Sequence, residues 1–261
     1  MVVKMNYAAS TKTALAGLVV ASSLAIAGCG GTVTTNATAP SATPATPKAT
    51  IAGSLDVSLL RYTDADFDVK ESPEELAISV PVVAVGVVAG WDQGPGLEIA
   101  PGGPLLHHVL LKMTVTDVLK GAKGNLAAAG GDLYIRIYQG PVVRDESKKP
   151  SEWSPGESVE DFQKAVPPGT RIMFFGQEDI IEEGRIKYSG IALPSAARRM
   201  IAPPQGLVLE DPALARLSPD AGSSLLGGMH GIDLGTASPW AKPKNMDELV
   251  ALLKSKDLQG S

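Results

Sequence analysis

The segment DADFDVKESPEE, residues 64–75, places oxygen-bearing side chains at the spacing of a calcium-binding loop. In a loop of twelve residues the ligands fall at positions 1, 3, 5, 9 and 12, which here are Asp64, Asp66, Asp68, Ser72 and Glu75. Carboxylate and hydroxyl oxygens are the hard ligands that Ca²⁺ takes. Position 6 holds Val69, although the sharp turn of such a loop calls for Gly. The spacing indicates a calcium site that departs from the usual pattern at the turn.

The same residues also fit a purely structural interpretation. Phe67 and Val69 can face inward from a short edge strand, with the acidic residues facing solvent. A helix would then begin after Ser72, because Pro73 suits the first helical position and Glu75 completes a capping box. Both interpretations stay open at the level of sequence.

The three histidines offer two further sites. His107 and His108 are adjacent, and neighbouring residues of a strand point to opposite faces, so they cannot chelate one metal ion without a bulge. His230 precedes Asp233 in a Gly-rich stretch, and the two could act as the base and its acidic partner in an envelope hydrolase. The chain contains no G-x-S-x-G sequence that would supply a serine nucleophile. A flexible loop explains His230 and Asp233 equally well.

The one cysteine of the chain, Cys29, ends an apolar run that begins at Ala14. Lys4 and Lys12 precede this run, which is shorter than a membrane span, and the pattern is typical of a secretory signal. The sequence LAIAGC at residues 24–29 resembles the lipobox of bacterial lipoproteins. The resemblance implies removal of residues 1–28, attachment of lipid such as palmitate to Cys29, and anchoring to the membrane. The alternative is a plain secretory signal followed by a free cysteine.

Residues 30–50 favour a tether. They contain seven Thr, five Ala and three Pro, and Lys48 is their one charged residue. Such a composition buries too little apolar surface to fold, and as a coil it spans about 25 Å. We therefore expect residues 29–50 to hold one exported domain, residues 51–261, away from the cell membrane and outside the cytoplasm.

The net charge of residues 51–261 is about −8, because all 28 acidic residues lie there. This charge argues against binding nucleic acid. Without Cys29 the chain has no thiol, which excludes disulfides, thiolate metal sites and cysteine nucleophiles. No cofactor is indicated beyond the calcium ion considered above.

Patterning predicts a mainly β domain: an antiparallel barrel or curled sheet with two or three short helices. Helices are expected after three capping residues, Ser72, Ser158 and Asn245. Strands are expected at residues 81–91, 105–121, 132–140, 167–177, 184–193 and 205–211, with edge strands at 54–62 and 66–70. The Gly- and Pro-rich segments 92–104 and 218–244 are expected to form loops, and Arg198 and Arg199 a surface turn.

Over roughly residues 70–180 this order resembles envelope proteins of Gram-positive bacteria with an OB-type or netrin-like barrel. It runs from SPEELA through VVAVGVVAGW, a long strand ending VLKG, and GDLYIRIYQG to PPGTRIMFFGQ. We expect a lipid-anchored, non-catalytic module that binds an envelope ligand or partner protein. The alternatives are an envelope hydrolase and a calcium-dependent adhesion or structural domain.

Overall fold

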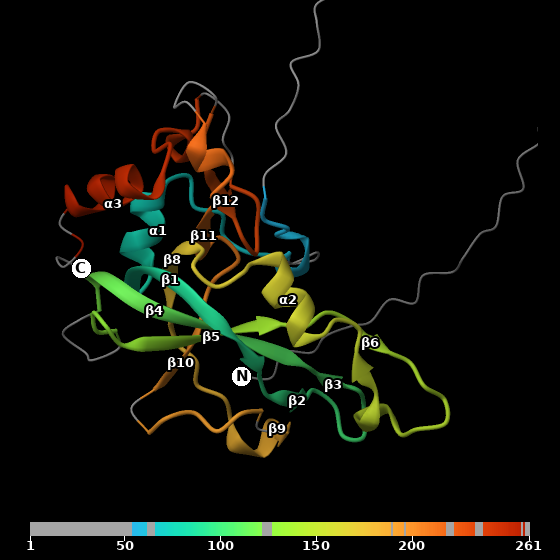
Figure 1. The fold of residues 1–261 in the computed structure, drawn as a ribbon. Coiled ribbons are helices and arrows are strands. Elements are labelled where there is room, and N and C mark those ends of the chain that lie inside the picture. The colour runs from blue at the N-terminus through green and yellow to red at the C-terminus, as the bar shows by residue number, and fades with distance from the viewer. Residues whose placement is uncertain are drawn as a thin grey trace, which may run out of the picture. The chain divides into compact units, whose positions relative to one another are not determined.

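The computed structural model describes residues 54–61, 66–121, 127–188, 190–195, 197–217, 222–232, 237–256 and 258. Their centre is a closed barrel of five strands, named here in their order around it: β1 (Val82–Gln93), β4 (His108–Lys120), β5 (Asp132–Tyr138), β10 (Arg198–Ile201) and β8 (Arg171–Glu178). Pairing of β1 with β8 closes the barrel. All of these pairings are antiparallel except that of β10 with β5. The predicted mainly β barrel is confirmed (Figure 1).

The barrel has the strand order of an OB-type fold. In chain order its third and fifth strands, β5 and β10, are the parallel neighbours, and α2 (Val159–Ala165) lies between the third and fourth. Phe162 of α2 packs against Trp91, with ring centroids 5.4 Å apart, and Trp91 Nε1 donates to the carbonyl oxygen of Val166 at 2.8 Å. Helix α2 is thereby fixed against the apolar interior of the barrel.

The barrel interior is filled by the alternating side chains that the sequence pattern predicts. From β4 these are Val109, Leu111, Met113 and Val115, all at most 1% exposed. Gly86 allows β1 and β4 to approach closely, because a Cβ there would lie 2.2 Å from the carbonyl oxygen of Thr114.

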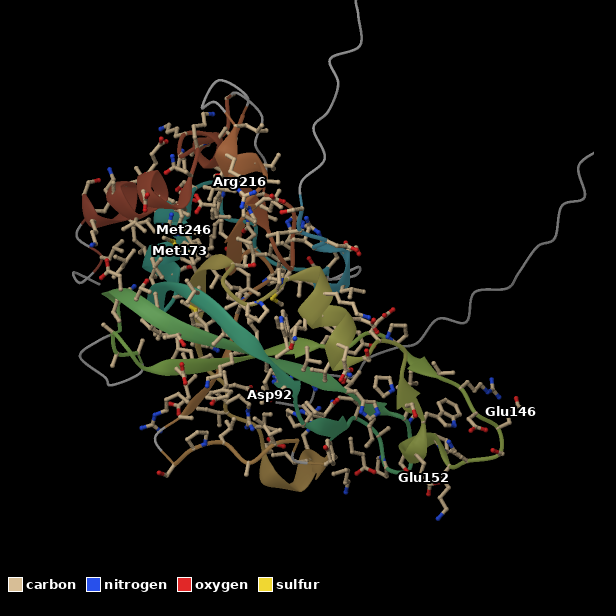
Figure 2. The ribbon with its side chains drawn as sticks, in the orientation of Figure 1. Asp92, Glu146, Glu152, Met173, Arg216 and Met246 are labelled. Atoms are coloured by element: carbon tan, nitrogen blue, oxygen red, sulfur yellow. The ribbon has the colours of Figure 1, made fainter. Side chains whose placement is uncertain are left out.

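A second core lies against the outer face of β1 and β8, which explains why β1 is apolar on both faces. Helices α1 (Pro73–Ser79) and α3 (Met246–Lys254) contribute to it. Met173 of β8 and Met246 of α3 are fully buried in this layer (Figure 2). The caps of α1, α2 and α3 are confirmed, since Ser72, Ser158 and Asn245 each accept a hydrogen bond from the backbone three residues on.

Further elements are attached to the barrel. Strand β11 (Leu207–Glu210) pairs with β8, and β12 (Leu225–Gly227) pairs with β11. A small sheet joins β2 (Gly96–Glu98), β3 (Leu105–Leu106) and β9 (Ile186–Tyr188), and β6 (Val142–Val143) pairs with β7 (Ser154–Pro155) in a projecting hairpin (Figure 1). The 3₁₀ turns are η1 (Ser58–Leu60), η3 (Pro150–Glu152), η4 (Glu183–Arg185), η5 (Leu214–Arg216) and η7 (Pro239–Ala241). None of the described helices is long and apolar enough to span a membrane.

Four element predictions were wrong. Of the edge strand expected at 54–62, the described residues 54–61 contain the turn η1 and no strand, and residues 66–70 are irregular, with Val69 55% exposed. The strand expected at 184–193 is only three residues long as β9. Arg198 and Arg199, expected in a surface turn, belong to the short strand β10. This strand pairs with β5 on one side and with β8 on the other.

Candidate functional site

The outer face of β4 and β5, where OB-type barrels bind oligonucleotides and oligosaccharides, is filled here by the chain itself. Three outward-facing residues of these strands are buried: His108, Leu110 and Tyr134 are at most 4% exposed. The loop that follows β8 is held against this face by Asp179, which accepts from Arg136 at 2.7 Å and from Arg199 at 2.8 Å. Figure 1 shows β9 and its flanking segments below β4 and β5. An open site must therefore lie elsewhere.

His108 belongs to this closed region and is neutral. Its Nδ1 donates to the carbonyl oxygen of Pro95 at 2.9 Å, and its Nε2 accepts from Arg136 at 2.8 Å. Burial, together with the Arg136 charge, lowers the pKa of His108 to about 4. A ring that already accepts from a guanidinium has no free nitrogen for proton transfer. His107, its neighbour, hydrogen-bonds through Nε2 to the carbonyl oxygen of Trp153, so the two rings are held by different partners.

The open concave surface lies on both sides of segment 66–71, which precedes α1. Lys70 fastens this segment: its N–H donates to Gln205 Oε1 at 2.7 Å, and its carbonyl oxygen accepts from Gln205 Nε2 and Trp240 Nε1, each at 3.1 Å. Gln205 and Trp240 are buried. The position of the segment is thus set by two residues more than 130 positions further along the chain.

On one side of the segment lies a cavity of about 350 Å³, which we call the α1 cavity. Its walls come from α1, the ends of β8 and β10, and the turn before β11; they include Phe67, Leu76, Val80, Gln177, Ile201 and Pro203. On the other side lies a cavity of about 390 Å³, the His230 cavity, whose walls include Val69, Glu71, His230, Gly231, Ser238 and Trp240. Lys70 and Gln205 border both cavities, and we call these two neighbouring cavities, which lie on either side of segment 66–71, the groove. Each has the size of a small-molecule site.

His230 borders its cavity and also carries a buried polar atom. Its ring meets Phe67 edge to face with centroids 4.9 Å apart. The Nδ1 atom is buried, and no described group hydrogen-bonds to it. A buried polar atom without a partner costs about 1–3 kcal/mol. Asp233, the expected acidic partner of His230, lies outside the described residues, so the base-and-acid pair of the hydrolase hypothesis stays a prediction.

One basic side chain, that of Lys70, borders both cavities. Lys70 forms an ion pair with the exposed Asp68. Arg61, the residue after η1, lies near Gly231, with Nη1 3.5 Å from the position that a Cβ would take there, but it does not line either cavity. Burial lowers the pKa of the Arg61 guanidinium.

The residues of the predicted calcium loop are not gathered around one point in the described part of the chain. Asp66 is exposed, Asp68 pairs with Lys70, and Glu75 accepts from the backbone N–H of Glu71 at 3.0 Å. Within the described residues no three acidic or histidine side chains form a group that could hold a metal ion. Asp64 and Cys29 lie outside those residues, and the calcium and lipid hypotheses stay predictions.

Sequence reasoning did not identify Arg61, Gln205 or Trp240. Each is a lone polar or aromatic residue in a stretch without a motif, and each matters only because distant segments meet. The sequence held one signal for Arg61. It directly follows the apolar pair Leu59 and Leu60, which pack into the core, so its side chain starts at the edge of the core.

No family model, no curated protein and no solved structure matches the chain.

Proposed function

We propose that the chain is an exported lipoprotein whose barrel domain is a non-catalytic module that binds a small ligand in the groove around segment 66–71. The lipobox-like sequence ending at Cys29 and the Thr/Pro-rich tract after it support the anchored location. The observation that carries the binding role is the groove, which has two cavities of about 350 and 390 Å³ and walls of mixed polarity.

A non-catalytic role fits the distribution of titratable groups better than a hydrolytic one. A catalytic acid or base usually has a pKa tuned by its surroundings and stands in a cleft. Among the described residues, His108 has the largest shift in pKa. Both of its ring nitrogens are engaged, one with Pro95 and one with Arg136, and it borders neither cavity. His230 does border a cavity, and its described surroundings offer a ligand contact in place of a nucleophile.

The groove is also built to hold its shape. Segment 66–71 is fastened at Lys70 through the side chains of Gln205 and Trp240, which themselves are buried in the body of the domain. A preformed wall lowers the entropy lost on binding, because few side chains need to be ordered by the ligand.

A ligand screen with blocked variants tests this role. The full chain carrying Cys29→Ser, which removes the sulfur required for lipid attachment, would be screened by thermal shift against wall fragments, glycans, organic acids and common metabolites. A ligand at a hundred times its Kd adds about 2.7 kcal/mol, which raises the Tm by about 5–10 °C in a domain of this size.

Two substitutions block the groove and one serves as control. Ser79→Trp fills the α1 cavity and Ala237→Trp fills the His230 cavity, whereas Ala89→Trp places the same side chain on the exposed face of β1. We expect each ligand to lose its effect in one of the two blocked variants and to keep it in Ala89→Trp. Ligands that stabilise all three variants equally would contradict binding in the groove.

The anchor has its own test. The unaltered chain is expected in the membrane fraction of cells that export it, and the Cys29→Ser variant in the soluble exported fraction. Equal membrane retention of both chains would contradict lipid attachment at Cys29.

A further inference from the structure

We propose that residues 179–188, here called the strap, cover the outer face of β4 and β5 and are released from it in acid, when His108 takes up a proton. OB-type barrels bind their ligands on this face. The proposal goes beyond the groove, whose described lining includes neither His108 nor any residue of the strap. It gives the barrel a second surface that is closed at neutral pH and opens in acid.

The strap is held by polar contacts and backbone pairing far more than by apolar packing. After Asp179, none of the strap side chains that the structure describes is buried. Ile180 is 89% exposed and Tyr188 is 49% exposed. A segment with few buried apolar contacts opens at a lower free energy than the core of a domain. The strap is therefore suited to open locally while the barrel stays folded.

The strap is fastened at both of its ends. At its start, the Asp179 carboxylate accepts from Arg136 at 2.7 Å and from Arg199 at 2.8 Å. The Asp179 N–H also donates to the carbonyl oxygen of Arg199 at 2.8 Å. At its end, β9 pairs with β2, where Tyr188 lies opposite Gly96 (Figure 1). The strap thus depends on a buried ion pair at one end and on the position of β2 at the other.

His108 connects the two fastenings, one through each nitrogen of its ring. Nδ1 donates to the carbonyl oxygen of Pro95, the residue before β2, at 2.9 Å. Nε2 accepts from Arg136 at 2.8 Å, and the same guanidinium donates to Asp179. Since His108 is the first residue of β4 and is 4% exposed, one buried side chain relates both ends of the strap to the barrel.

A proton on Nε2 of His108 disrupts this arrangement, because the nitrogen then becomes a donor that faces the donors of Arg136. Titratable or charged groups face the ring from β5, from the preceding residue and from the strap: Arg136, Tyr138, His107 and Asp179. Burial and the Arg136 charge outweigh the attraction of Asp179 and lower the pKa of His108 to about 4. With the strap open and the ring in water, the pKa returns to about 6.5. Acid therefore favours the open state.

Thiol labelling of the full chain carrying Cys29→Ser measures this opening, because that chain has no other thiol. Leu110→Cys places a thiol on the outer face of β4, opposite Arg136 in the sheet, at a position that is 1% exposed. Met113→Cys places a matched thiol on the interior face of the same strand. The reagent is dithiodipyridine, which reacts with thiols in acid as well as at neutral pH, and each rate is divided by that of an unfolded peptide at the same pH.

The thiol of Leu110→Cys is expected to react at least about tenfold faster than that of Met113→Cys, because only the former is exposed by local opening. Between pH 7.5 and pH 5.0 its rate should rise by about thirtyfold, the change in the opening equilibrium that the two pKa values of His108 give.

Further substitutions in the Leu110→Cys chain locate the effect. His108→Gln should make the labelling rate independent of pH in this range. Asp179→Asn should raise the rate at both pH values, because it weakens the fastening at the start of the strap. The control is His107→Gln, whose ring is held by the carbonyl oxygen of Trp153, and this variant should keep the full pH response.

Since Leu110→Cys can loosen the sheet by itself, hydrogen exchange of the chain with its barrel unaltered accompanies the labelling. Local opening exposes little surface, so exchange of the Asp179 N–H should not respond to low concentrations of urea. The N–H of Phe175 in β8 should exchange faster as urea is added, because it needs the barrel to unfold. The protection of Asp179 should fall by about thirtyfold from pH 7.5 to pH 5.0.

Equal labelling rates at the two positions, or exchange of Asp179 that follows urea as Phe175 does, would overturn the proposal, because the face would then open only when the whole domain unfolds. A rate at Leu110→Cys that does not change with pH would overturn it as well. So would a pH response that His108→Gln leaves intact.

Discussion

Acidification should destabilise the folded chain through one buried ring, that of His108. Its pKa is about 4 in the folded state, because of burial and the Arg136 charge, against about 6.5 in an unfolded chain. At a pH between these two pKa values, the ring is protonated in the unfolded chain and neutral in the folded chain. The free energy of unfolding therefore falls as the pH falls. The full difference corresponds to about 3 kcal/mol, at about 1.36 kcal/mol for each pH unit.

The hydrogen bonds of His108 explain why its ring stays unprotonated in the folded chain. Nδ1 already carries a hydrogen, which it donates to Pro95, and Nε2 faces the guanidinium of Arg136. A proton on Nε2 would set two positive donors 2.8 Å apart in a site that is 4% exposed. The ring therefore stays neutral until the surroundings loosen.

Urea denaturation at pH 7.5 and at pH 4.5 measures the effect. We expect the free energy of unfolding to fall by about 2–3 kcal/mol between the two, since most of the linked loss occurs above pH 4.5. Carboxyl groups with ordinary pKa values near 3.9 to 4.3 are already partly protonated at pH 4.5 in the unfolded chain. The fold lowers the pKa of several of them, such as Asp56 and Asp211, so they add to the loss, and the comparison with His108→Gln is needed to isolate the share of His108. His108→Gln should remove most of this loss even though it lowers stability at both pH values, and His107→Gln should preserve it. A His108→Gln variant with the same pH dependence as the parent would refute the reasoning.

Three further results are expected. Asp211→Asn should cost about 2–3 kcal/mol in chemical denaturation, because this fully buried carboxylate accepts from the backbone N–H groups of Leu55 and Ala213 and fastens the start of the domain. Gly86→Ala should cost about 2–4 kcal/mol, since its Cβ has no room, whereas Gly90→Ala, with no atom within 4 Å of its Cβ, should change stability by less than about 1 kcal/mol. The calcium hypothesis predicts a rise of Tm in millimolar calcium that EDTA reverses and Asp66→Ala abolishes; a Tm that calcium leaves unchanged would end it.

The barrel was predictable because its strands carry local signals. Alternation in β4 identifies Val109 and Leu111 as interior residues, and Ser72 with Pro73 marks the start of α1 without any knowledge of tertiary structure. The apolar pattern of β1 on both faces indicates two covering layers, which are the barrel interior and the α1–α3 layer.

The strand β10 was not predictable, because it carries no such local signal. Its four residues lie in a short stretch between Pro194 and Pro203 and contain two arginines, so no local pattern distinguishes them from a turn. Arg199 is part of the sheet because Asp179 neutralises it from the following loop of β8, a contact between residues twenty positions apart. Short strands whose charges are satisfied only by tertiary contacts carry no signal in sequence.

The groove also depends on contacts between residues that are far apart in the sequence. His230 was named from sequence for chemistry with Asp233, whereas in the described residues it contacts Phe67 and borders the cavity beside Trp240. Spacing in the sequence suggests contacts between residues that are close in the chain, whereas the fold brings together residues that are far apart in it. The segment 194–244, in which only the strand at 205–211 was expected, also contributes the barrel strand β10 and much of the groove wall.

Native mass spectrometry of the protein released from its own membrane tests most directly whether the groove holds a small molecule. A bound small molecule is expected on the parent chain and on Ala89→Trp, and it should be lost from Ser79→Trp or Ala237→Trp. A parent chain that carries no small molecule, or the same molecule retained by both blocked variants, would contradict binding in the groove.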